Sequence, residues 1–176
     1  LAVEHELFVG RVVVWRSDGQ DGSGAGVYGQ RFDAAGAKVG AEFLVNTTVS
    51  SNQYDAHVAT LTGGGFVVVW SDDGSHDSSG VGVYGQRFDA AGSKLGGEFL
   101  INQSTPGNQY QPAVSALESG GFVVTWYNEY AGAGNSWYDV YKREYQADGT
   151  PAAGEVVVNA VPNNAGQYEP AVAHLG

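Results

Sequence analysis

The residues best suited to chemistry recur three times along the chain, as a glutamine, a tyrosine and a third polar residue in direct succession. A tyrosine ring can stack on a sugar while neighbouring amide and carboxylate groups bond its hydroxyls. Several such sites would add weak contacts through multivalency. The structural alternative is that each tyrosine packs between repeats and each glutamine holds backbone in place. The three sets are Gln53, Tyr54 and Asp55; Gln109, Tyr110 and Gln111; and Gln167, Tyr168 and Glu169.

Four tryptophans add large aromatic surfaces. Trp15, Trp70 and Trp126 each end an apolar run, so we expect them in the core. Trp137 has no counterpart in the other repeats and is the better candidate for an exposed ligand platform.

Two glycine-rich loops, at residues 17–24 and 71–80, carry closely spaced acidic side chains. Carboxylates, serine hydroxyls and freely bending glycines can wrap a calcium ion with oxygen ligands. The spacing is not that of an EF-hand, and residues 128–135 of the third copy have lost most of the acids, so a solvated turn is the alternative. The candidate calcium ligands are Asp18, Asp21, Asp72, Asp73 and Asp77.

No catalytic set follows from spacing. The four histidines, His5, His57, His76 and His174, occupy non-equivalent positions, and no serine, histidine and acid combination can be derived from them. A pair of carboxylates for glycoside cleavage stays open, because any two of the 19 acidic residues can meet in a fold.

An internal repeat must position all of these residues. Residues 27–36 and 83–92 are identical over ten positions, and residues 140–149 are a diverged third copy. The tyrosines at 28, 84 and 141 are 56 and 57 residues apart. The tryptophans at 15, 70 and 126 keep a similar period, so three copies of one structural unit are expected.

Each unit contains four predicted strands, exemplified by residues 112–117, 122–126, 83–89 and 98–102. Glycine turns and β-branched or aromatic runs are typical of short antiparallel strands. Residues 66–70 are apolar on both faces, which favours a sheet stacked between two others. We therefore predict an all-β β-propeller with three four-stranded antiparallel blades. A β-sandwich and a solenoid are the competing layouts.

The chain is predicted to be a single repeat domain over 1–176. Blade 1 covers 1–54, blade 2 covers 55–110 and blade 3 covers 111–168, with residues 1–3 on a first strand and residues 169–176 forming an extra first strand. Unpaired strand edges are templates for another chain. Two copies joined head to tail would give a closed ring of six blades, so a homodimer or higher homo-oligomer is expected. The alternative is a piece of a longer array, and the missing initial methionine indicates a processed or excised chain.

Composition excludes several partners. The net charge is −11, from 19 acidic and 8 basic side chains, and no basic run offers a track for nucleic acid. The chain has no cysteine, so neither disulfides nor thiolate metal sites are expected. No apolar stretch approaches the roughly 20 residues of a membrane span, so membrane insertion is not expected.

Three segments, residues 66–70, 82–89 and 42–46, carry a resemblance to known proteins. They resemble the propeller-like repeats of very large secreted bacterial proteins of the RTX or adhesin type, which are often calcium-associated. The resemblance implies an extracellular or cell-surface location, although the nonapeptide calcium repeats that often accompany such proteins are missing here.

The functional expectation is a non-enzymatic extracellular binding module for glycans or other cell-surface polymers. One alternative is a structural, self-assembling repeat unit of a large secreted protein. Another is a fragment of a polysaccharide-acting enzyme.

Overall fold

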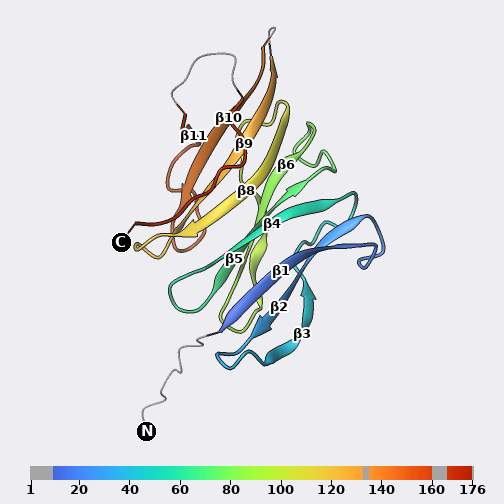
Figure 1. Ribbon diagram of the computed structural model, residues 1–176, viewed down its shortest axis with the longest axis vertical. Helices are drawn as coiled ribbons and strands as arrows, with labels where there is room; N and C mark the ends of the chain where they lie inside the picture. The colour runs from blue at the N-terminus through green and yellow to red at the C-terminus, as the bar shows by residue number, and fades with distance from the viewer. Residues whose placement is uncertain (1–9, 133–134, 160–165, 176) are drawn as a thin grey trace.

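The computed structural model describes residues 10–132, 135–159 and 166–175, and in these the regular structure is entirely β-strand. The strands form three antiparallel sheets that are stacked and do not close into a ring (Figure 1). The described chain contains no helix that could span a membrane. The first sheet contains β1 (Arg11–Asp18), β2 (Ala25–Phe32) and β3 (Lys38–Leu44); the second β4 (Gln53–Thr60), β5 (Phe66–Asp72), β6 (Gly82–Phe88) and β7 (Lys94–Leu100); the third β8 (Asn108–Ala116), β9 (Phe122–Gly132), β10 (Asn135–Tyr145) and β11 (Val156–Val157).

The repeat builds the same strand register three times. The tryptophan that follows each apolar run is paired across the sheet with the tyrosine of the next strand. These pairs are Trp15 with Tyr28, Trp70 with Tyr84 and Trp126 with Tyr141. Equivalent sequence positions therefore occupy equivalent places in three sheets.

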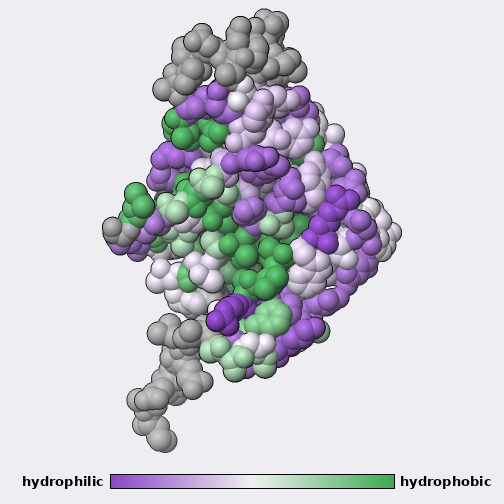
Figure 2. Space-filling model, in the orientation of Figure 1, coloured by the Kyte–Doolittle hydropathy of each residue, from purple (hydrophilic) through white to green (hydrophobic). Residues whose placement is uncertain are grey.

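The second sheet is buried on both faces, as the pattern of residues 66–70 predicts. Phe66, Val68 and Trp70 pack in a core shared with the first sheet. Val67 and Val69 point the other way, into a core shared with the third sheet. Because side chains alternate along a strand, one apolar strand supplies two cores. Figure 2 shows apolar side chains gathered near the middle of one face of the molecule, with hydrophilic side chains around them.

Two predicted first strands have different outcomes. The one at residues 1–3 lies outside the described residues. The extra one at the end of the chain forms no regular strand over residues 166–175. It begins as the earlier repeats do, since Gln167 N donates to Tyr138 O at 2.9 Å and Gln109 N donates to Val81 O at 2.8 Å. Farther along, His174 N donates to the Ser115 side chain at 3.1 Å. This segment thus runs beside β8 (Figure 1) without a backbone ladder.

Candidate functional site

The third residue of each Gln-Tyr-polar set has an unusual backbone conformation. Asp55, Gln111 and Glu169 have φ of 52°, 48° and 53°. The strand register shifts after Tyr54 and after Tyr110. A non-glycine residue in the left-handed region costs about 1 kcal/mol or more, and such strain gathers at functional sites. The bulge recurs in the second and third sheets, and Glu169 has the same backbone conformation at the equivalent position of the last repeat.

The bulges bring successive repeats together. Asp55, Gln111 and Glu169 line one hollow of about 330 Å³, together with Ala56, His57 and Pro170. Asp55 and Glu169 are exposed on its wall. A hollow of this volume is at the small end of the range for sites that take a small molecule or a single sugar ring.

The wall of the hollow is rich in hydrogen-bond acceptors. Partial burial raises the pKa of Asp55 above its ordinary value, against the lowering influence of His57 and Arg16. Gln111 N donates to Ser71 Oγ at 3.2 Å. The Oε1 atom of Gln111 is buried and accepts no hydrogen bond from the described residues. Buried acceptors normally have partners, so this amide oxygen is an unsatisfied acceptor inside the wall, and the exposed carboxylates of Asp55 and Glu169 are the acceptors that a ligand can reach.

A tyrosine directly precedes each of the three repeated residues that line the hollow. Tyr168 is 54% exposed, whereas Tyr54 and Tyr110 are half-buried. The ring centroid of Tyr127 lies 5.4 Å from that of Tyr110 and 5.9 Å from that of Tyr168. Tyr138 completes this tyrosine cluster, at 4.8 Å from Tyr168. We use the name tyrosine cluster for Tyr110, Tyr127, Tyr138 and Tyr168.

The environment raises the pKa of the hydroxyls of Tyr54, Tyr127 and Tyr138, so these stay protonated at neutral pH. Burial raises the pKa of Tyr127 to about 12 and raises that of Tyr54 as well. Tyr138 Oη donates to Glu129 Oε1 at 3.1 Å, which together with the Glu129 charge raises the pKa of Tyr138. Sequence reasoning missed Tyr127 and Tyr138 because neither belongs to the repeated sets; Ser71 occupies the place of Tyr127 in the second sheet.

The glutamines of the sets join neighbouring sheets. Gln53 and Gln109 are fully buried. Gln109 Oε1 accepts from Asn102 Nδ2 at 3.0 Å, and its Nε2 donates to Asn128 Oδ1 at 3.2 Å. Gln53 repeats this bridge between Asn46 and Asp72, and Gln167 Oε1 accepts from Asn159 at 3.1 Å. The glutamine side chains are thus occupied by hydrogen bonds within the protein. Within each set, only the tyrosine and the third polar residue are left to contact a ligand.

The predicted calcium ligands are engaged with protein donors. No group of three or more histidine, cysteine or acidic side chains gathers in the described part of the chain to hold a metal ion. Asp18 pairs with Arg16 at 2.7 Å. The other four accept from nearby donors: Asp21 from Ser23 N, Asp72 from Gly74 N, Asp73 from Asn52 N and Asp77 from Ser79 N. A calcium site and a solvated turn both stay predictions for these loops, and the hydrogen bonds to protein donors favour the solvated turn.

The tryptophans separate into two groups. Trp70 and Trp126 are 1% and 0% exposed, which confirms their place in the core. Trp15 is half-buried, on the sheet that has a neighbour on only one side in the described structure. Trp137 lies in β10 opposite Tyr130, but its side chain is outside the described part of the molecule.

Comparisons with known proteins add little. No protein-family model matches the chain, and no curated protein matches its sequence. Among solved structures, an endo-arabinase from Bacteroides thetaiotaomicron is similar with 12% sequence identity and a TM-score of 0.49. The match covers 77% of this chain and 54% of that chain, so this chain spans about half of the enzyme's length. A likeness at this level supports no conclusion about fold or activity.

Proposed function

We propose that the protein is an extracellular or cell-surface glycan-binding module and that the hollow lined by Asp55, Gln111 and Glu169 is its ligand site. The observation that carries the proposal is the convergence of three equivalent, strained positions from successive repeats on one hollow. The exposed carboxylates of Asp55 and Glu169 offer acceptors to sugar hydroxyls. The half-exposed Tyr168 ring supplies an apolar face beside them.

Binding is tested on a broad glycan array, followed by calorimetric titration of the best ligand. The double variant Asp55→Asn, Glu169→Gln removes both charges and should weaken binding at least about tenfold, because hydrogen bonds to charged groups contribute roughly 1.5 to 3 kcal/mol each. Glu118→Gln is the matched control, because Glu118 is an exposed acid just beyond the opposite end of β8. No binding across the array, or equal loss in the control, contradicts the proposal.

We further propose that the three sheets are blades of a β-propeller. The first strands of the second and third sheets, β4 and β8, contact each other. β1 of the first sheet contacts β4 in turn. The hollow is lined by residues of β4, of β8 and of the segment at Glu169 and Pro170. Successive sheets related in this way around one axis are the arrangement of blades.

We propose a second copy of the chain as the partner. The outer faces of the first and third sheets expose residues whose counterparts are buried at the inner junctions, where two sheets of one chain meet. Val158 is 53% exposed, whereas its counterparts Val45 and Ile101 are fully buried between sheets. On the first sheet, Val13 is 50% exposed and its counterpart Val68 is fully buried. Docked head to tail, two copies would cover both faces and form six blades.

Charges at these outer faces are complementary. At the inner junctions Arg31 Nη2 donates to Ala90 O at 2.8 Å and Arg87 Nη2 donates to Ala147 O at 2.7 Å. In the third sheet, Glu144 occupies the register position that Arg87 occupies in the second sheet.

The first sheet departs from the pattern in a matching way. Arg11 stands where Phe66 stands in the second sheet. Because Arg31 and Phe66 line the same hollow between sheets, Glu144 of one copy would lie near Arg11 of the next.

Light scattering across a concentration series tests this association. Glu144→Arg and Arg11→Glu should each weaken the dimer, and the double charge exchange should restore it. A strict monomer at every concentration, or equal loss in the double variant, would show that the outer faces are not joined in this way.

A polysaccharide-cleaving enzyme is the second candidate function. Asp55 and Glu169 line the same hollow, and the raised pKa of Asp55 is a property of a general acid. New reducing ends from a bound polysaccharide, lost in Asp55→Asn, would favour the enzyme over the simple binding module.

A further inference from the structure

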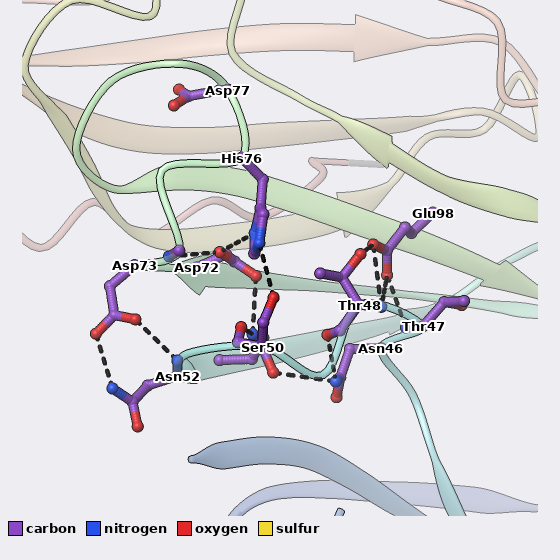
Figure 3. Close-up of polar contacts among 12 residues, drawn as sticks. Asn46, Thr47, Thr48, Ser50, Asn52, Asp72, Asp73, His76, Asp77 and Glu98 are labelled. Atoms are coloured by element: carbon purple, nitrogen blue, oxygen red, sulfur yellow. Dashed lines mark hydrogen bonds and ion pairs between the residues drawn. The ribbon is translucent and has the colours of Figure 1, made fainter. Parts of the chain in front are cut away.

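A serine, a histidine and an aspartate are hydrogen-bonded in series where the link after β3 meets the loop after β5 (Figure 3). Ser50 Oγ lies 3.0 Å from His76 Nε2. His76 Nδ1 lies 2.8 Å from Asp72 Oδ1. The next junction lacks the set, because Pro106 occupies the place of Ser50 in the next link, three residues before the repeated glutamine. Unlike the amide bridges, it is therefore not part of the repeated framework.

The hydrogen bonds determine which histidine nitrogen carries the proton. The Asp72 carboxylate is 3% exposed and accepts from Gly74 N at 2.8 Å and from Gln53 Nε2 at 2.9 Å. A carboxylate only accepts, so His76 Nδ1 must donate to it. In the neutral imidazole the Nε2 lone pair is then left to accept the Ser50 hydroxyl proton, which is the arrangement of a nucleophile and its general base.

Local backbone geometry holds the histidine and the serine in place. Gly74 lies so close to the His76 ring that an added Cβ would overlap it. Ser51, next to the serine, has φ of 68°, and Ser75, next to the histidine, has φ of 54°. Left-handed non-glycine residues beside both groups are strained positions of the kind that gather at reactive sites.

We propose that Ser50 and His76 form a hydrolytic site for small carboxylic esters, with Asp72 as the positioning residue. Ser50 Oγ would attack the ester carbonyl carbon and form a carbon–oxygen bond, while its proton passes to His76 Nε2. Collapse of the tetrahedral intermediate breaks the ester bond, and the leaving alcohol takes that proton. Water then attacks the acyl-serine with His76 again as base, releasing the carboxylic acid and restoring Ser50.

The surroundings of Ser50 select the substrate class. Ser50 is exposed, and His76 is accessible with 30% of its side chain exposed. Neither side chain lines the hollow that contains Asp55, Gln111 and Glu169. An open site suits a short acyl group, such as acetyl, carried on a larger molecule. This activity does not depend on ligand binding at the hollow near Asp55.

Covalent labelling with a fluorophosphonate tests the site. Attack by an activated serine forms an oxygen–phosphorus bond and releases fluoride, and peptide mass spectrometry locates the label. We expect labelling of Ser50 at one equivalent, and hydrolysis of 4-nitrophenyl acetate that stops on labelling.

Three variants make the test specific. Ser50→Ala should abolish labelling, and His76→Asn should slow it at least about 100-fold, the lower range of general-base catalysis. Ser23→Ala changes a serine in the loop after β1, which corresponds to the loop after β5 that carries His76. This variant should be labelled as the parent protein is. Circular dichroism confirms that the exposed-site variants stay folded. An unlabelled Ser50, or labelling unaffected by His76→Asn, overturns the proposal.

Discussion

The amide bridge at Gln109 offers a sharp test of how the sheets are joined. Gln109 makes three side-chain hydrogen bonds: from Asn102 Nδ2 at 3.0 Å, to Asn128 Oδ1 at 3.2 Å and to Pro106 O at 3.3 Å. Its side chain is fully buried between the second and third sheets. Gln109→Ala therefore removes all three bonds and leaves polar partners without water.

The cost follows from these contacts. Each hydrogen bond contributes about 1 kcal/mol net, and the remaining unsatisfied groups and the cavity add to the loss. We expect Gln109→Ala to lower the free energy of unfolding by about 3 to 5 kcal/mol. In a chain of this length, that corresponds to a fall in Tm of roughly 6 to 20 °C.

Urea unfolding followed by tryptophan fluorescence measures the effect. Gln146→Ala is the matched control on an exposed turn and should change stability by less than about 0.5 kcal/mol. Gln167→Ala, at the partly exposed end of the chain, should cost about 1 kcal/mol. If Gln109→Ala costs no more than Gln167→Ala, the buried bridge does not hold the sheets together.

Three further outcomes are expected. The pKa of Asp55 is higher in the folded protein than in the unfolded chain, so its contribution favours folding at low pH and is lost as the pH rises through the folded value. In thermal unfolding, Asp55→Asn should thus stabilise the protein at pH 7 relative to pH 3. The opposite trend contradicts the pKa direction. Gly121→Ala should lower the unfolding free energy by more than about 1 kcal/mol in urea titration, because an added Cβ would overlap the Tyr145 carbonyl oxygen; unchanged stability would show that the strands can separate there. Calcium should raise Tm by less than about 1 °C, because the loop aspartates already accept protein hydrogen bonds; a larger rise that a chelator reverses would establish a calcium site.

The fold was predictable where sequence repetition and strand periodicity act together. The identical segments at 27–36 and 83–92 indicate equivalent strands, and the two apolar faces of residues 66–70 require a sheet on either side. The missing regular strand at residues 170–175 was not predictable, because a strand needs a partner edge that sequence similarity does not supply.

The site was predictable only in part. The repeated sets located Asp55, Gln111 and Glu169, but their convergence on one hollow depends on how the sheets stack. Ser50 and His76 come from different repeats and have no repeated spacing, so only the folded chain brings them together. Aspartates in glycine-rich loops suggest calcium by composition, yet nearby backbone N–H groups can satisfy them equally well.

A titration followed by two-dimensional NMR tests the central claim most directly. The oligosaccharide that binds best on the array is added to the isotope-labelled protein, and the backbone amide shifts are followed. The account predicts that the amides of Asp55, Gln111 and Glu169 shift together, with one dissociation constant. Shifts confined to a single repeat, or an absence of shifts at these three positions, would contradict it.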